Sequence, residues 1–237
     1  MTPATGAPDA AGRALPRATS VLAVCAHPDD ESFGLGAVLG HFAARGAGVA
    51  VLCFTRGEAS TLGGSDPSLH ESLHESLHEL RRLELGRAAL ELGVGTVVLG
   101  DHPDGALRDE PLDELAAEVA ALAYETQADL LVVFDEGGVT GHPDHCRATE
   151  AALAGAPGLP ALAWAIPDRV ADELNAALGA GFVGRRASET DLVVPVDRGP
   201  QRRAIACHAS QCDGNPVLEE RLRLMGDTEW LRWLRRP

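Results

Sequence analysis

The sequence predicts an α/β fold: a Rossmann-like open sheet, mostly parallel, with helices on both faces. Short apolar runs of strand length alternate with longer segments of helical periodicity along the chain. Several runs are apolar throughout, which is typical of strands buried on both faces of a parallel sheet. Two of them lead directly into clusters of His and Asp, and ligand sites in such sheets lie where the strands end.

The first elements follow from composition and hydrophobic runs. Residues 1–20 are rich in Ala, Pro, Thr and Gly without periodicity, which predicts a flexible arm ahead of one domain at 21–237. That domain opens with a continuous apolar run at 21–26, expected to be a buried strand. A helix is expected at 32–45, and the apolar run at 49–54 predicts the next strand.

A Gly-rich polar loop then leads to a helix expected at 69–92, whose first turns repeat the sequence ESLH. The period of four in residues 69–79 places His70, His74 and His78 on one helical row. Three imidazoles in a row can bind a metal. A solvated row beside a row of leucines explains the repeat without chemistry, and we favour that interpretation.

The remaining chain continues the alternation of short apolar runs, expected to be strands, and longer amphipathic segments, expected to be helices. In order, the expected elements are a strand at 96–99, a helix at 112–125, a strand at 130–134, a helix from about 144 to 154, a strand at 161–166, a helix at 167–178, a strand at 192–196, and closing helices at 197–207 and 217–234.

Composition excludes several classes of partner. The net charge is −15 and all 20 basic residues are Arg, which argues against binding to nucleic acid or to an anionic membrane. No apolar stretch approaches the length of a membrane span, and the amino terminus lacks an apolar signal core. Five irregularly spaced cysteines predict reduced thiols. We therefore expect a cytoplasmic protein with a small-molecule partner; assembly into homo-oligomers stays open.

The first polar cluster follows the strand at 21–26. His27 and Asp30 lie three positions apart around a Pro turn and can hold a divalent metal, for which imidazole and carboxylate are typical ligands. This leaves Asp29 free for chemistry. The alternative is that Asp29, Asp30 and Ser32 only cap the following helix.

The second cluster follows the strand at 130–134 and again contains a His-Pro-Asp unit. His145 would complete a set of three ligands with His27 and Asp30, the pattern of catalytic zinc; Fe²⁺ or Co²⁺ can occupy the same groups. His142 would stabilise an oxyanion or protonate a leaving amine, with Asp144 orienting its ring, unless Asp144 only caps a helix.

Residues 26–31, AHPDDE, and 141–145, GHPDH, closely resemble the motifs of the PIG-L/LmbE family of zinc-dependent N-deacetylases. Weaker similarities run from about residue 21 to residue 211. The resemblance implies an LmbE-like fold, Zn²⁺ as the cofactor and a linear amide bond as the target. The residues it implies are the ligands His27, Asp30 and His145, the general base Asp29, and His142 as the electrophilic or acid group with Asp144 behind it.

The substrate-binding residues are expected to be Glu31, Arg81 and Asp104. Arg81 and Asp104 match family positions that are implied in sugar-hydroxyl binding, but Arg81 also fits a surface ion pair and Asp104 an ordinary turn. His208 and Gln211 match a family His-x-Ser-Gln and equally fit packing or capping. The loop from 59 to 79 matches no family motif and borders the crevice.

These observations favour a metal-dependent hydrolase that removes an N-acetyl or related N-acyl group from an amino sugar or a sugar-containing small metabolite, such as one of secondary metabolism. A bulkier amide, as in a thiol-conjugate amidase, and a metal-binding protein without catalysis are the alternatives. A dinucleotide-binding protein is a remote one, because Gly34, Gly36 and Gly40 lie within a predicted helix instead of in the turn after the strand. The sequence does not predict the identity of the substrate.

Overall fold

The strands form one mixed sheet with the expected α/β architecture. The computed structural model describes residues 14–60, 70–212 and 215–237, with the backbone alone for 70–76. The strands are β1 (Ser20–Cys25), β2 (Gly48–Thr55), β3 (Thr96–His102), β4 (Leu130–Phe134), β5 (Ala161–Pro167), β6 (Gly184–Arg185), β7 (Leu192–Pro195) and β8 (Thr228–Arg235). Their order is β3-β2-β1-β4-β5-β8-β7, and β6 pairs with β5. All pairs are parallel except those of β8 with β5 and β7.

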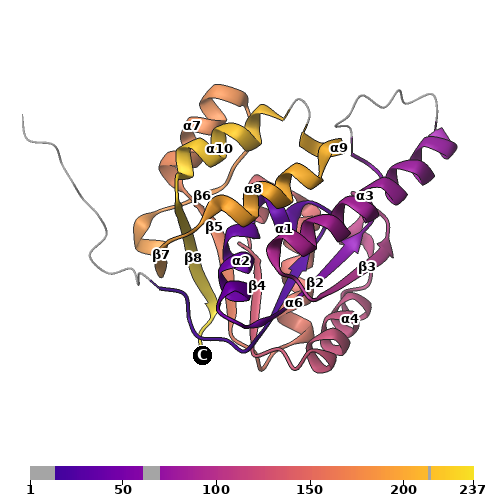
Figure 1. Cartoon of the computed structure of the whole chain (residues 1–237), viewed down its shortest axis with the longest axis horizontal. Helices are drawn as coiled ribbons and strands as arrows, with labels where there is room; N and C mark the ends of the chain where they lie inside the picture. Colours follow the sequence, from indigo (N-terminus) through magenta and orange to yellow (C-terminus); the bar gives the residue numbers. More distant parts are fainter. Residues whose placement is uncertain (1–13, 61–69, 213–214) are drawn as a thin grey trace, which may run out of the picture.

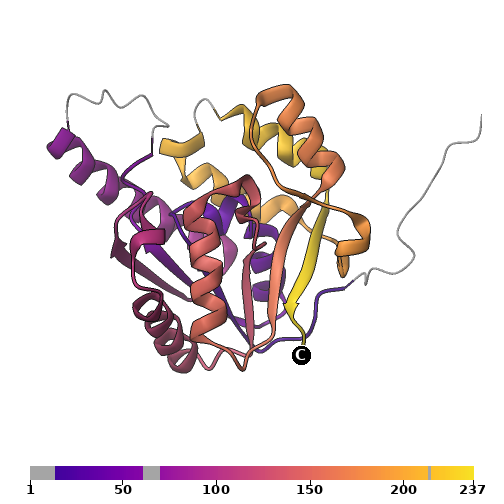
Figure 2. The same ribbon diagram turned by 180° about the vertical axis from the view of Figure 1, so that it is seen from behind.

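Helices cover both faces of this sheet. They are α1 (Asp30–Phe33), α2 (Gly36–Ala44), α3 (His70–Leu92), α4 (Leu112–Glu125), α5 (Gly138–Gly141), α6 (Pro143–Gly155), α7 (Asp168–Leu178), α8 (Arg198–Cys207), α9 (Ala209–Cys212) and α10 (Pro216–Met225), with 3₁₀ turns at Leu107–Asp109 and Ala187–Glu189. Helices α2, α3 and α8 lie in front of the sheet (Figure 1), and α4 and α6 cover its other face (Figure 2). Each face has its own core, because the strands alternate their apolar side chains between the two.

The direction of chain winding reverses between β1 and β4. Strand β1 pairs in parallel with β2 on one side and with β4 on the other. The crevice above such a reversal is the usual ligand site of an open α/β sheet. Both His-Pro-Asp units follow these two strands, so residues more than a hundred positions apart reach the same crevice.

Two of the three glycines of the possible fingerprint lie inside a helix, as expected, whereas Gly34 lies between α1 and α2. Gly36 and Gly40 belong to α2, and a Cβ atom built on them would lie 3.0 Å from Gln201 and 3.4 Å from Pro200 of α8. These glycines therefore permit close packing of two helices and do not form a phosphate-binding turn after β1.

The bounds of several predicted elements need correction. The helix expected at 32–45 breaks into α1 and α2 around Gly34, where a Cβ atom would lie 2.3 Å from the ring of Phe134. The strand expected at 96–99 extends to His102.

The helix expected at 217–234 is wrong in its second half. It ends at Gly226, which has a φ of +56° that favours glycine, and residues 228–235 form β8. Strand β8 fills the place between β5 and β7 and buries Glu229 and Leu231, two residues apart. The apolar residues of TEWLRWLR have the spacing of a helix, so the strand follows from pairing with β5 and β7 and not from the local pattern.

Residues 1–13 of the arm expected at 1–20 lie outside the described part of the chain, and residues that follow them pack against the domain. Leu15 is buried in the core, and Thr19 donates two hydrogen bonds to the Asp129 carboxylate at 2.8 and 2.7 Å.

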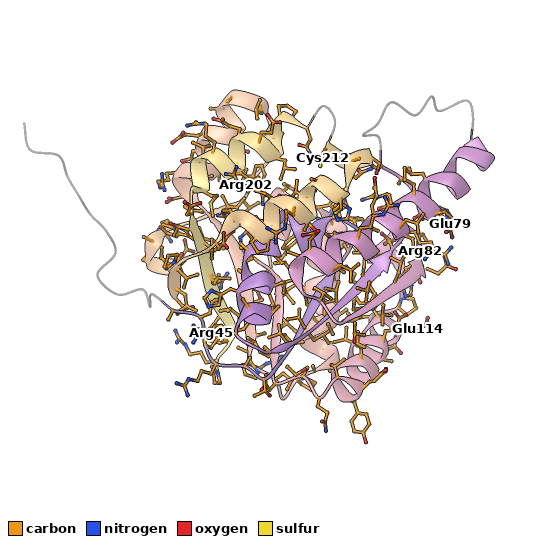
Figure 3. All side chains as sticks on the ribbon, in the orientation of Figure 1. Arg45, Glu79, Arg82, Glu114, Arg202 and Cys212 are labelled. Carbon is orange, nitrogen blue, oxygen red and sulfur yellow. The ribbon has the colours of Figure 1, made fainter. Side chains whose placement is uncertain are left out.

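The described part of α3 exposes charged side chains on its outer face. Charged side chains such as Glu79 and Arg82 point outward (Figure 3). Helix α3 confirms the helix predicted there, but the side chains of His70 and His74 lie outside the described residues. Nowhere in 14–60, 70–212 and 215–237 does a helix combine the length and apolar character that crossing a membrane requires.

Candidate metal centre

The side chains of His27, Asp30 and His145 converge on one point in the crevice. His27 Nδ1 lies 3.2 Å from His145 Nε2 and 3.6 Å from Asp30 Oδ2, and His145 Nε2 lies 3.2 Å from Asp30 Oδ1. Ligand bonds of about 2.0–2.2 Å in tetrahedral geometry separate the ligand atoms by roughly 3.3–3.6 Å. The three side chains therefore fit a shared tetrahedral ion, with one vertex left open.

The other nitrogen of each imidazole is held by an acceptor behind it. His27 Nε2 lies 3.0 Å from Asp104 Oδ1 and 3.4 Å from Asp144 Oδ2, and His145 Nδ1 lies 3.0 Å from the carbonyl of Gly138. Carboxylate and carbonyl oxygens accept only, so these nitrogens carry the protons. The nitrogens that face the shared point are then free to bind an ion, the arrangement that orients metal-binding histidines in proteins.

Backbone amides fix the third ligand. Asp30 Oδ2 accepts hydrogen bonds from the N–H groups of Ala26 and His27 at 3.1 and 2.9 Å. Burial alone would raise the pKa of Asp30, but the neighbouring charges and hydrogen bonds of His145 and His27 hold this pKa well below its usual value. Asp30 therefore stays a carboxylate.

Asp29 stands in a strained turn beside these ligands. Its φ is 136°, a conformation that non-glycine residues rarely adopt and that is found at functional sites. Arg81 donates to its Oδ2 at 3.1 Å, which leaves Oδ1 for a water molecule. Burial raises the pKa of Asp29 to about 6, with Asp30 adding to this and Arg81 opposing it. Asp29 makes no side-chain capping bond to α1, so the capping alternative is wrong for this residue.

His142 reaches the pocket with a defined tautomer. Its Nδ1 accepts a hydrogen bond from the backbone N–H of Asp144 at 3.2 Å, so a neutral ring carries its proton on Nε2. Burial lowers the pKa of His142, and the charges of His27 and His145 lower it further. A neutral ring with a proton on Nε2 can donate a hydrogen bond to a developing oxyanion.

The prediction that the Asp144 carboxylate orients the His142 ring is wrong. Its oxygens accept from the N–H groups of Gly105 and Leu107 at 2.7 and 3.2 Å, and one of them faces His27 Nε2. His142, not Asp144, is the N-cap of α6, so the capping alternative for Asp144 is wrong too. Asp144 thus lies behind His27, one of the predicted metal ligands, and holds His142 through its backbone N–H.

Glu31 does not line the pocket, although it was predicted to bind substrate. It is fully buried, and its Oε1 lies 2.7 Å from His208 Nε2 while its Oε2 accepts from the backbone N–H of Asp29 at 2.9 Å. Sequence spacing gave no sign of this pair, because His208 lies 177 positions further along the chain. Glu31 therefore positions the Asp29 turn, and His208 ties the carboxyl-terminal helices to it.

Replacing His208 by Gln should destabilise the protein by about 3–5 kcal/mol near pH 6, because the buried Glu31 charge loses its counter-charge. Burial alone would lower the pKa of His208, but Glu31 raises it above its ordinary value. The stabilisation is therefore complete below the unfolded pKa, about 6.5, and is lost as pH rises through the folded pKa. Urea unfolding at pH 6 and pH 9 measures both effects.

The half-exposed His41 of α2 provides the control for that experiment. The change His41→Gln should alter the free energy of unfolding by about 0.5 kcal/mol or less. A His208→Gln protein as stable as this control at pH 6 would contradict the stabilising role of the pair.

Arg81 is not a surface residue, so its surface ion-pair alternative is wrong. It is 2% exposed and donates to the carbonyls of Gly57 and Pro28 as well as to Asp29. Asp104 faces His27 with one oxygen and accepts from the N–H of Ala59 at 2.8 Å with the other. Both residues still line the pocket, and substrate binding by them stays a prediction.

The pocket in front of these groups has a volume of about 570 Å³ and is open to a small molecule. The residues that line it are His27, Asp29, Asp30, Ala59, Ser60, Arg81, Asp104, Gly105, Thr140, His142, His145, Gln211 and Asn215. For Gln211 the sequence left open both a role in the site and a role in packing or capping. Thr140 and Asn215 were not predicted as site residues. Asn215 also caps α10 by accepting from the backbone N–H of Leu218. An Asn directly before a helix is ordinarily interpreted as such a cap.

Comparisons with known proteins agree with this geometry. The family described as "PIG-L: GlcNAc-PI de-N-acetylase" matches residues 22–156, more than half of the chain. A 1D-myo-inositol 2-acetamido-2-deoxy-alpha-D-glucopyranoside deacetylase from Kineococcus radiotolerans is 34% identical over 158 residues, which cover 56% of this chain and 43% of the relative. The chain spans about half the length of the curated relatives it matches.

Solved structures share the fold. An N,N'-diacetylchitobiose deacetylase from Pyrococcus horikoshii has a TM-score of 0.68 and 23% identity, covering 92% of this chain and 84% of its own. A 4-carboxy-2-hydroxymuconate hydratase from Pseudomonas putida KT2440 has a TM-score of 0.66 and 17% identity, covering 91% and 96%. One fold thus serves two reaction types, and the reaction has to be argued from the residues of the site.

Proposed function

Because the chain belongs to the PIG-L family, we propose that it is a metal-dependent amidohydrolase that removes an N-acetyl or related N-acyl group from an amino sugar or a sugar-containing small metabolite. The observation that carries this proposal is the convergence of His27, Asp30 and His145 in the pocket that Asp29 and His142 also line. The name of the Kineococcus relative, a deacetylase of an acetamido sugar, supports this substrate class.

Each of the main pocket residues has a separate role in the proposed reaction. A bound divalent ion such as Zn²⁺ lowers the pKa of water and polarises a carbonyl. Asp29 takes the proton of the water that attacks the amide carbon, while Arg81 holds its other oxygen in place. His142 donates its Nε2 proton as a hydrogen bond to the carbonyl oxygen as negative charge develops there. The proton on Asp29 then passes to the amine nitrogen, the C–N bond breaks, and acid and amine leave.

The donor set of two imidazoles and one carboxylate suits Zn²⁺, and Fe²⁺ or Co²⁺ suits it too. Zn²⁺ as the native ion, a cytoplasmic location and assembly into homo-oligomers stay predictions. Arg81 and Asp104 are the residues from which we expect contacts to sugar hydroxyls.

A substrate panel tests the proposal. Purified protein is first analysed for its metal content, then incubated with N-acetylglucosamine, N,N'-diacetylchitobiose and N-acetylglucosaminyl-inositol, and the free amine is measured. We expect amine release from at least one of them, loss of this activity with a chelator, and its return with added Zn²⁺. Folded, metal-loaded protein that releases amine from none of them would refute an N-acetylated amino sugar as substrate.

A further inference from the structure

A second, smaller cavity of about 150 Å³ opens off the metal pocket. The two share Asp30, Thr140, His145 and Asn215 in their walls, so the smaller cavity begins at two of the predicted metal ligands. We call it the side pocket. A substrate amide held at the metal would have one of its two halves directed into it.

Aromatic rings form the wall of the side pocket. The ring centroid of Phe134 lies 4.9 Å from that of His145 and 5.5 Å from that of Trp164, and Phe33 and Phe182 also line the cavity. An apolar cavity of roughly 150 Å³ is large enough for a benzene molecule. The side pocket therefore holds several more atoms than the single methyl group of an acetyl.

The far end of this wall carries a buried cation. The guanidinium of Arg221 lies 5.1 Å from the centroid of the Trp164 ring, and Arg221 is only 6% exposed. It donates one hydrogen bond to the carbonyl of Phe33, and no carboxylate of the described residues lies within ion-pair distance of it. Burial lowers the pKa of Arg221 to about 10, so it remains charged at neutral pH.

The charge of buried Glu229 acts on Arg221 and raises its pKa, but Glu229 already has partners of its own. Glu229 forms an ion pair with Arg198 and accepts a hydrogen bond from Trp164 Nε1 at 2.6 Å. Arg198 and Arg221 thus bring two positive charges to a buried group with one carboxylate. A buried cation that shares its only nearby counter-charge with a second arginine is costly, and the side pocket is where a ligand anion can reach Arg221.

We propose that the side pocket binds the acyl half of the substrate and that this half is the monoacyl group of a short dicarboxylic acid, such as succinyl, whose free carboxylate pairs with Arg221. This inference rests on the proposed amidohydrolase function and specifies its acyl group. The aromatic wall contacts the methylene groups, and the carboxylate reaches Arg221. Hydrolysis adds water across the C–N bond and releases the dicarboxylate and the free amine.

Three N-acylglucosamines test the proposal with metal-loaded wild-type protein: N-acetyl, N-succinyl and N-succinamoyl. The last two differ only in that a carboxylate is replaced by an uncharged amide. We expect kcat/KM for N-succinyl to exceed that for N-succinamoyl at least tenfold, on the basis that hydrogen bonds to charged groups are stronger. Equal values, or a preference for the uncharged group, would overturn the proposal.

Two variants on α10 test whether Arg221 causes the preference for N-succinyl over N-succinamoyl. Arg221→Met, which removes the charge, should reduce the preference to less than about threefold. Arg223→Gln should keep the wild-type preference, since Arg223 lies two residues away, is 65% exposed and pairs with Glu220. A preference that persists in Arg221→Met would assign it to another residue and overturn the proposal. If Arg221→Met does not fold, Arg221→Lys, which retains the charge, must keep a preference above threefold.

Calorimetry separates this proposal from the proposed function. Succinate and succinamate both offer one carboxylate to the metal, and only succinate offers a second to Arg221. We expect wild-type protein to bind succinate at least tenfold more tightly. Tighter binding of succinate without turnover of any amide would refute the hydrolase and retain the side pocket. Turnover of N-acetylglucosamine with equal binding of both acids would retain the hydrolase and refute the side pocket.

Discussion

Replacing Asp29 by Asn should lower kcat by about two to four orders of magnitude, the usual contribution of general acid–base catalysis, while the bound metal stays at the wild-type amount. Asn has the same shape, and its carbonyl oxygen can still accept the hydrogen bond from Arg81. It also tolerates a positive φ better than most residues do. The substitution therefore removes the proton acceptor and leaves the three ligands in place. Steady-state kinetics and elemental analysis of the same preparation measure both quantities.

Asp101 offers a matched control for this change. It lies in β3, and its side chain is 81% exposed and paired with Arg56. The change Asp101→Asn should leave kcat and metal content unaltered. If the Asp29→Asn protein turns over at the wild-type rate, another group accepts the proton and the proposed mechanism is wrong.

Replacing His145 by Gln should abolish both metal retention and hydrolysis. Loss of a group behind a metal ligand typically costs about 10–100-fold in metal affinity, so loss of a ligand itself should exceed about 100-fold. Gln keeps a polar side chain of similar volume beside Phe134, so the wall of the pocket is retained. Elemental analysis after dialysis, and titration with Zn²⁺ followed by calorimetry, measure the loss.

The two substitutions have opposite expected effects on the metal. Asp29→Asn keeps it and His145→Gln loses it, although both stop turnover. The half-exposed His41 again provides the control, since His41→Gln removes an imidazole outside the pocket. Wild-type metal content in the His145→Gln protein would show that the ion binds elsewhere, and the shared site would have to be abandoned.

Predictions from sequence succeeded where the signal was local. The strands β1 and β4 were predicted within one residue, because each is a short apolar run ended by polar residues. The His-Pro-Asp units at their ends could be placed in one crevice by topology alone, and the structure brings their imidazoles within 3.2 Å of each other. The prediction for residues 228–235 failed because their apolar residues recur with helical spacing, whereas the strand buries Glu229 and Leu231 between its neighbours.

The sequence could not predict the roles of residues whose partners lie far away along the chain. Glu31 was expected to face the substrate, and its burial depends on His208, which the last helices bring to it. Asp144 was expected behind His142, and its carboxylate instead faces His27 and two backbone amides. Arg221 received no role at all, because its neighbours Trp164 and Phe33 belong to a strand and a helix far away in the chain.

The sequence by itself determined the fold class, the pair of strand ends that carry the candidate site and the chemical type of its ligands. These properties follow from apolar runs and turns of a few residues each, because backbone geometry and the alternation of side chains depend on neighbouring residues. Only the tertiary structure decided which carboxylates face the pocket, which are neutralised in the interior and what lies beside the metal. Burial and charge pairing depend on the side chains that packing brings together, and these come from segments far apart in the chain.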